Sequence, residues 1–167
     1  MKNIEIELKY KIDDIGQMTE QIEKLGAEFK QESTGVDTYY IVPDNPGGKK
    51  YLRVRKKDGN AELDYHYAQS ETRTDEWETG VASADMTNEI LRQLGFQIDV
   101  TIEKKRTVYT YKNSELVLDE IKDLGTFIEI ESPNEEELQS IIKELNLKGN
   151  QRVKSMGYSD LKRGYMF

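Results

Sequence analysis

The alternation of charged with apolar side chains is the feature that most constrains this chain. Between residues 3 and 11 every even position is aliphatic or aromatic, while the odd positions include Glu5, Glu7 and Lys9. A period of two residues is typical of a β-strand with two unlike faces, because successive side chains of a strand point to opposite sides. The chain therefore begins with a strand that carries charge on one face only.

The same pattern, interrupted by turn residues, predicts the secondary structure of most of the chain. We expect further strands at residues 36–42, 51–57, 61–69, 73–81, 99–111, 115–121 and 126–131. Apolar residues at helical spacing predict helices at residues 13–25, 83–95 and 134–145, and a short one at 159–163. About eight strands joined mostly as hairpins, with three or four helices, favour an α+β fold with an antiparallel sheet. The 167 residues are expected to form one domain, 1–167.

Two arrangements can explain charges that gather on one face of strand after strand. In the first, helices cover one face of an open sheet and water covers the other. In the second, the sheet closes into a barrel, its lumen is lined with charge, and its apolar face lies under the helices. The sorting of signs favours the barrel, because acids dominate the first and last strands while Arg53 with Arg55, and Lys104 with Arg106, form basic pairs.

A lumen of this kind needs counter-ions. Like charges ~4 Å apart repel by ~4 kcal/mol at an effective dielectric constant of ~20. A bound polyanion together with a divalent metal would relieve this repulsion, since arginine binds phosphoryl oxygens in a bidentate manner and carboxylates are the ligands that Mg²⁺ prefers. The pattern thus predicts a phosphate-rich ligand held with Mg²⁺ or Mn²⁺.

Composition excludes several other classes of function. The chain has no cysteine, so it can form neither a disulfide nor a catalytic thiolate, and with His66 as its only histidine it cannot build a multi-histidine zinc site. A net charge of −8 argues against nucleic acid and against anionic membranes as partners. We expect a cytoplasmic protein, because the sequence has neither a membrane-spanning apolar run nor a signal peptide.

Familiar catalytic motifs are missing as well. The segment Gly47-Gly48-Lys49-Lys50 lacks the spacing of a phosphate-binding P-loop, and GxGxxG does not occur. A serine–histidine–aspartate mechanism would depend entirely on His66, without a nucleophile elbow. Neither chemistry is expected here.

The order of motifs along the chain resembles the CYTH superfamily, which includes class IV adenylyl cyclases, thiamine triphosphatases and inorganic triphosphatases. The resemblance starts with Glu5-Ile6-Glu7-Leu8-Lys9 and covers nearly the whole chain, most closely in the pattern of the class IV cyclases. The later motifs are Asp37-Thr38-Tyr39-Tyr40, Leu52-Arg53-Val54-Arg55, Arg73 with Glu76 and Glu78, Lys104-Lys105-Arg106, Leu118-Asp119-Glu120, residues 124–131 and Gly157-Tyr158-Ser159-Asp160-Leu161.

The resemblance implies a closed eight-stranded antiparallel barrel, a triphosphate tunnel, and roles for particular residues. By resemblance the metal-side carboxylates are Glu5, Glu7, Glu76, Glu78, Asp119, Glu129 and Glu131. The residues expected to bind the triphosphate are Lys9, Arg53, Arg55, Arg73, Lys104 and Arg106. Catalytic roles are expected for Glu5, Glu7, Lys9, Tyr39 and His66.

One position departs from the family pattern. His66 stands where the family usually has a lysine, which in thiamine triphosphatases is thought to pair with a tyrosine corresponding to Tyr39 and to activate water. A neutral imidazole accepts a proton but supplies less positive charge. A solvent-facing His66 without a role is the alternative interpretation.

Three functions therefore stay open. The leading hypothesis is cyclisation of ATP to cyclic AMP and pyrophosphate with Mg²⁺ or Mn²⁺. The first alternative is hydrolysis of tripolyphosphate, thiamine triphosphate or a nucleoside triphosphate, and the second is a non-catalytic module that binds polyphosphate or nucleotide. A homodimer is expected only by analogy with the family.

Overall fold

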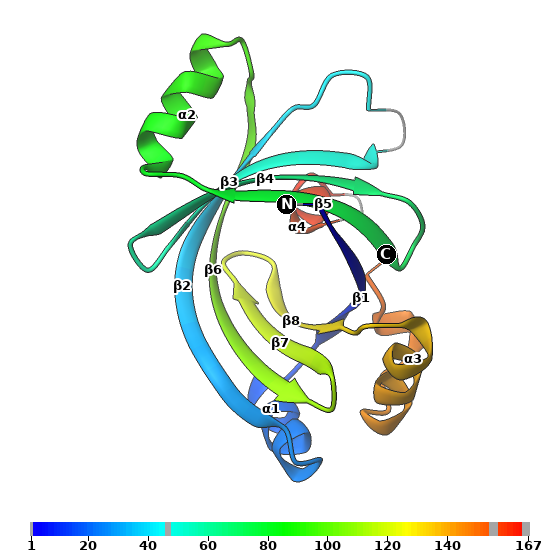
Figure 1. The fold of residues 1–167 in the computed structure, drawn as a ribbon. Helices are drawn as coiled ribbons and strands as arrows, with labels where there is room; N and C mark the ends of the chain where they lie inside the picture. The colour runs from blue at the N-terminus through cyan, green and yellow to red at the C-terminus, as the bar shows by residue number, and fades with distance from the viewer. Residues whose placement is uncertain (1, 46–47, 154–156, 165–167) are drawn as a thin grey trace.

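The chain folds as a closed antiparallel β-barrel (Figure 1). The computed structural model describes residues 2–45, 48–153 and 157–164, and within them eight strands follow one another around the barrel in the order β1-β5-β4-β3-β2-β6-β7-β8. The strands are β1 (Lys2–Ile12), β2 (Glu28–Tyr40), β3 (Lys50–Lys57), β4 (Asn60–Ala68), β5 (Arg73–Gly80), β6 (Ile98–Tyr111), β7 (Ser114–Ile121) and β8 (Gly125–Glu131). The predicted α+β fold with a closed eight-stranded barrel is confirmed.

Four α-helices pack against this barrel in the part of the chain described: α1 (Ile15–Lys24), α2 (Ala84–Gln93), α3 (Glu135–Glu144) and α4 (Tyr158–Lys162). A 3₁₀ turn, η2 (Gly149–Gln151), precedes α4. The three longer helices begin at the side-chain caps Asp14, Ser83 and Asn134, each of which accepts a hydrogen bond from a backbone N–H of the first turn. Among these helices none is both long and apolar enough to cross a membrane.

The main apolar core lies outside the barrel wall, between strands and helices. Leu8 and Tyr10 of β1 pack with Ile128 and Ile130 of β8 under α1 and α3. A second cluster lies under α2, which packs on β3 and β4. Much of the apolar face of the strands is therefore buried under helices, although Ile4, Tyr67 and Trp77 stay exposed, and the charged face is left to face the lumen.

One part of the barrel interior is also apolar. Inward side chains of β2, β6, β7 and β8 form a cluster there with Val153, which follows η2, and Tyr158, the first residue of α4: Tyr39, Ile102, Ile121 and Phe127. The helix α4 packs on β6. Because this apolar cluster fills one part of the barrel, the charged part of the lumen lies in the rest of the tunnel.

The strand β2 differs from the prediction. It begins at Glu28 rather than Val36 and pairs with β6 along its whole length. Its first five residues are exposed, so burial imposes no apolar alternation on them. Pairing with the long β6, rather than a local pattern, makes this segment a strand.

Candidate functional site

The charged side chains of the strands converge on one cavity in the barrel, with a volume of about 180 Å³. Seven of the strands, all but β7, line this cavity together with Gly157, the N-cap of α4, and Tyr158, its first residue. The lining residues are Glu5, Glu7, Lys9, Tyr39, Tyr51, Arg53, Arg55, His66, Glu76, Glu78, Lys104, Arg106, Glu129, Glu131, Gly157 and Tyr158. Their order around the barrel separates the charges by sign.

One side of the cavity is basic. Arg53 and Arg55 come from β3 and Lys104 and Arg106 from β6, the two strands that flank β2. We call these four residues the basic wall. Period-two alternation places both members of each pair on the inner face of their strand, and strand pairing through β2 brings the two pairs together.

A buried aspartate on β2 organises the basic wall. Asp37 lies opposite Arg55 in the β2–β3 register, and its carboxylate contacts Arg55 Nε at 3.1 Å, Lys104 Nζ at 2.8 Å and Arg53 Nη1 at 3.4 Å. Burial alone would raise the pKa of Asp37, but Lys104, Arg53 and Arg55 hold it well below its usual range. Asp37 is thus a fixed anion that orients three cations.

Neighbouring strands supply two more buried aspartates to the bases. Asp64 of β4 lies opposite Arg53, whose Nε donates to both carboxylate oxygens at 3.0 Å. Asp119 of β7 accepts from Arg106 Nε at 2.8 Å, from Arg106 Nη2 at 2.6 Å and from the Tyr158 hydroxyl at 2.8 Å. Both guanidinium groups are therefore held in place on the side away from the cavity.

Lys104 is the one base whose charge the lumen weakens. Burial, followed by the nearby Arg106 and Arg55, lowers the pKa of Lys104 to about 7 even though Asp37 acts in the opposite direction. An additional anion in the cavity would restore its positive charge. A lysine that gains its full charge when an anion binds is expected in a site for a polyanion.

The opposite side of the cavity is acidic. Six glutamates line it from three adjacent strands, β8, β1 and β5: Glu5, Glu7, Glu76, Glu78, Glu129 and Glu131. We call this set the acidic wall. Glu7 lies directly opposite Glu131 in the β1–β8 register, a like-charge pair that is unfavourable without a cation.

A single lysine neutralises part of the acidic wall. Lys9 Nζ lies 2.5 Å from Glu7 Oε1 and 3.3 Å from Glu129 Oε2. Burial opposes ionisation of Glu129, yet Lys9 and Arg106 lower its pKa overall. Other members respond differently: burial and neighbouring glutamates raise the pKa of Glu5 to about 9 and that of Glu131 to about 7. Carboxylates that repel one another in this way are suited to a shared divalent cation.

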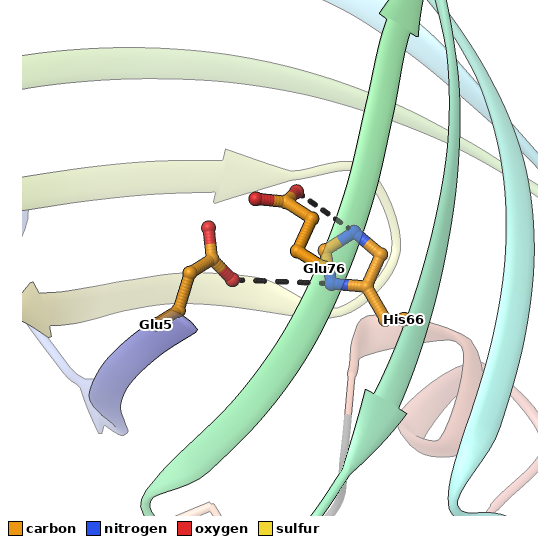
Figure 2. Close-up of side chains that lie close together, drawn as sticks. All are labelled: Glu5, His66 and Glu76. Carbon is orange, nitrogen blue, oxygen red and sulfur yellow. Dashed lines mark ion pairs between the residues drawn. The ribbon is translucent and has the colours of Figure 1, made fainter. Parts of the chain in front are cut away.

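The acidic wall fits a divalent metal by the chemistry of its donors. Carboxylate oxygens are the hard ligands that Mg²⁺ and Mn²⁺ take, and burial together with neighbouring carboxylates raises the pKa values of Glu5 and Glu131, which a bound cation would lower. Within the described residues, Glu5, His66 and Glu76 form a group whose ligand atoms lie within 4.8 Å of one another (Figure 2). The residues that would hold a metal thus lie on β1, β5 and β8, with His66 of β4 beside them.

His66 is buried, which excludes the solvent-facing alternative. The ring of Tyr51 stacks on it with centroids 4.2 Å apart, and Tyr51 also makes an edge contact with Tyr39. Tyr39 and His66 make no hydrogen bond to each other within the described residues, since Tyr51 contacts both rings. The tyrosine–lysine pair that the resemblance implies has no direct counterpart here.

The structure brings thirteen of the fifteen predicted site residues to the cavity. Arg73 is exposed on the outer face of β5, the face opposite to Glu76 and Glu78, and does not line the cavity. Asp119 is fully buried behind Arg106 and is likewise not among the lining residues. Arg73 points outward because it has the opposite strand parity to Glu76 and Glu78. Asp119 is held out of the cavity lining by its ion pair with Arg106.

Sequence reasoning missed four residues of the site. Asp37 and Asp64 bind the bases, and Tyr51 and Tyr158 line the cavity. A signal existed for the aspartates, because Asp37 precedes Tyr39 by two residues and Asp64 precedes His66 by two, which places each pair on one strand face. Tyr51 carries the same signal, because it precedes Arg53 by two residues, whereas Tyr158 carries none, since it reaches the lumen from a helix at the far end of the chain.

Comparisons with known proteins agree with this geometry. The sequence matches the CYTH domain family over residues 3–165. It is 33% identical over 159 residues to a Methanocaldococcus jannaschii protein named "Putative adenylate cyclase MJ0240", covering 86% of this chain and 90% of that protein.

Solved structures show the same fold. A protein of Pyrococcus horikoshii OT3 superposes with a TM-score of 0.85 at 28% identity, covering 94% of this chain and 98% of that one. A "putative adenylyl cyclase" from Hippeastrum, described as having a dominant triphosphatase activity, superposes with a TM-score of 0.66 at 18% identity, over 98% and 96% of the two chains. The charged tunnel and the match over nearly the whole sequence together establish that this chain belongs to the CYTH domain family.

Proposed function

We propose that this protein, as one domain, converts ATP to cyclic AMP and pyrophosphate in its barrel, with Mg²⁺ or Mn²⁺ as cofactor and in the cytoplasm. The observation that carries the proposal is the opposition of the two walls across one cavity of about 180 Å³. A triphosphate chain between them would meet cations on one side and metal-binding carboxylates on the other. The M. jannaschii relative, by its name, supports the cyclase among the reactions of such a site.

The basic wall would bind the phosphate chain. Arg53, Arg55 and Arg106 already have their guanidinium groups oriented by buried aspartates, so little side-chain freedom is lost on binding. Lys104, whose pKa is about 7 without ligand, would become fully charged against a phosphoryl group. These four cations would also stabilise the charge that moves onto the departing pyrophosphate.

The acidic wall would hold the metal, with Glu5, Glu7, Glu129 and Glu131 as the carboxylates. When bound, the metal supplies positive charge that lowers the pKa of the ribose 3′-hydroxyl and screens the phosphates. In the reaction the 3′-oxygen forms a bond to the α-phosphorus, the bond from that phosphorus to the bridging oxygen breaks, pyrophosphate leaves, and the hydroxyl proton is released. Lys9 contacts Glu7 and Glu129 and so holds both carboxylates in position.

Hydrolysis of a triphosphate is the second candidate. The cavity lining is charged apart from three tyrosines, His66 and Gly157, which suits a substrate recognised through its phosphates alone. Against it, His66 occupies the place of the usual lysine and Tyr51 separates it from Tyr39, so water activation by that pair is not supported. The cyclase therefore remains our first proposal.

The test is product analysis by phosphorus NMR. Purified protein is incubated with ATP, and separately with tripolyphosphate, with Mg²⁺ or Mn²⁺ from neutral to alkaline pH. Cyclic AMP with pyrophosphate from ATP is the expected result. Orthophosphate with pyrophosphate from tripolyphosphate would replace the cyclase with the hydrolase, and binding without any product would replace both with a binding module.

Two variants make this test specific. Glu129→Gln removes a carboxylate that contacts both Lys9 and Arg106 and should abolish product formation. Arg92→Ala, on the exposed side of α2, removes a cation far from the cavity and should leave the rate unchanged. Equal rates for wild type and Glu129→Gln would place the chemistry outside the barrel.

A further inference from the structure

His66 is the one nitrogen ligand that this chain can offer to a metal through a histidine, and it lies among carboxylates. It belongs to β4, while Glu5 comes from β1 and Glu76 from β5 (Figure 2). His66 Nε2 lies 3.0 Å from Glu76 Oε1, and Nδ1 lies 3.9 Å from Glu5 Oε2. The three side chains point toward one another from three neighbouring strands of the barrel.

The ring is buried without a hydrogen bond. Only 3% of the His66 side chain is exposed, and neither ring nitrogen hydrogen-bonds to any residue that the structure describes. Glu76 is close enough to accept, but its oxygen lies off the direction in which a ring N–H would donate. The ring nitrogens thus have carboxylate oxygens close by, Glu76 Oε1 at 3.0 Å and Asp64 Oδ1 at 3.1 Å from Nε2, without a well-directed N–H bond to either, and a cation bound between them would complete the arrangement.

The spacing of the ligand atoms is compatible with a shared metal ion. Two ligand atoms at right angles around an ion, each ~2.1 Å from it, lie ~3.0 Å apart and off each other's lone-pair direction. The distance from His66 Nε2 to Glu76 Oε1 matches this value. Tyr51, stacked on the imidazole, fixes the plane of the ring and hence the direction of its lone pairs.

We propose that Glu5, His66 and Glu76 form a site for a first-row divalent transition ion, such as Mn²⁺ or Co²⁺, with His66 as a direct nitrogen ligand. An imidazole next to two carboxylates is a borderline donor set, which favours these ions over Mg²⁺, an ion that prefers oxygen ligands and retains its waters. A protonated lysine at this position could not ligate a metal, so the histidine gives this chain a preference of its own.

Asp64 does not complete this donor set. Its Oδ1 lies 3.1 Å from His66 Nε2, but both of its oxygens accept from Arg53 Nε. Asp64 is therefore committed to Arg53, and the donor set consists of Glu5, His66 and Glu76, whose ligand atoms lie within 4.8 Å of one another. The site is independent of the proposed reaction, because it requires metal binding and no turnover.

The direct test is pulsed electron paramagnetic resonance of Mn²⁺ bound to the full, tag-free chain without substrate. The chain has one histidine, so any imidazole nitrogen coupling must come from His66. The wild type is expected to show this coupling, His66→Gln to lose it, and Tyr67→Phe, the next residue on β4, to keep it. Bound Mn²⁺ without imidazole coupling, or no bound Mn²⁺, would overturn the proposal on the wild type alone.

Metal affinities provide a second measurement. Calorimetric titration should give tighter binding of Co²⁺ than of Mg²⁺ to the wild type, and His66→Lys should weaken Co²⁺ by ~10-fold or more while changing Mg²⁺ less. An unchanged ratio of the two affinities in a folded His66→Lys variant would contradict nitrogen ligation. Neither measurement depends on product formation, so a failed cyclase assay would leave this result untouched.

Discussion

The two walls of the tunnel differ in how their charges are balanced: the four cations of the basic wall have partners, whereas most of the six glutamates of the acidic wall repel one another. In the basic wall each cation has a buried aspartate as partner, and Asp37 alone contacts three of them. In the acidic wall six glutamates share Lys9 as the one base from their own three strands that lines the cavity. The basic wall is thus neutralised from within the fold, whereas the acidic wall depends on something added to it.

The pKa values express the same difference. The cations hold the pKa of Asp37 well below its usual range, while burial and neighbouring carboxylates raise that of Glu5 to about 9. The basic wall is preorganised to bind an anion, and the acidic wall would be stabilised by a cation. Together they suit a metal–polyphosphate complex. The following predictions test whether the two walls really differ in this way.

The largest expected effect is on stability. Asp37→Ala leaves three buried or half-buried cations without their partner and should lower the free energy of unfolding by about 3–5 kcal/mol, as measured in urea. Glu5→Gln on the acidic wall is the matched variant. It should raise the free energy of unfolding at pH 7, because a carboxyl group whose pKa rises from 4.5 to about 9 must take up a proton on folding, whereas the neutral amide need not. Equal losses for the two variants would mean that the walls do not differ.

The next effect concerns ligand binding by the basic wall. Arg55→Ala removes a guanidinium that faces the cavity, and a charge-assisted hydrogen bond is worth about 1.5–3 kcal/mol, so the affinity for tripolyphosphate should fall by about 10- to 100-fold. Isothermal titration calorimetry measures the loss. An affinity like that of wild type would remove Arg55 from the binding site.

The pH dependence of stability should report the acidic wall. The pKa of Glu131 is raised from 4.5 to about 7 and that of Glu5 from 4.5 to about 9, so the folded state binds more protons than the unfolded state above pH 4.5. The stability linked to these groups is complete below pH 4.5 and is lost as the pH rises through the folded values. We expect the melting temperature of the metal-free protein to fall between pH 5 and pH 7.

Saturating Mg²⁺ or Mn²⁺ should remove this decline, since the metal takes the place of the protons. Above pH 7 Lys104 acts in the opposite sense, because its pKa of about 7 lies below the ordinary value and its native-state charge is lost. The window below pH 7 is therefore the informative one. A melting temperature that is flat between pH 5 and pH 7 in EDTA would contradict the repulsion assigned to Glu5 and Glu131.

The smallest expected effect belongs to Arg73. This residue is exposed on the outer face of β5, so Arg73→Ala should change the tripolyphosphate affinity by less than ~2-fold, within the range of screened surface charges. The comparison with Arg55→Ala separates a motif residue that faces the lumen from one that does not. A loss as large as that of Arg55→Ala would require a ligand that extends beyond the cavity.

Alternation predicted which charged side chains share one face of each strand, because strand parity is a local property, whereas their roles in the site came from the resemblance. The closing contact of β1 with both β5 and β8 depends on pairing between distant strands and could only be expected from the resemblance. The exposed start of β2 carried no apolar pattern, so its pairing with β6 was missed. Asp119 was expected at the metal, but the register places it opposite Arg106, whose guanidinium it holds.

The most direct test of the two-wall account is the coupling between metal and triphosphate. A non-hydrolysable imido analogue of tripolyphosphate is titrated calorimetrically into the protein, alone in EDTA and as its Mg²⁺ complex. The account predicts that the complex binds ~10-fold or more tightly than the free anion, and that Glu129→Gln loses this gain. Equal affinities with and without Mg²⁺ would show that the acidic wall does not hold a metal against the phosphates, and would contradict the account.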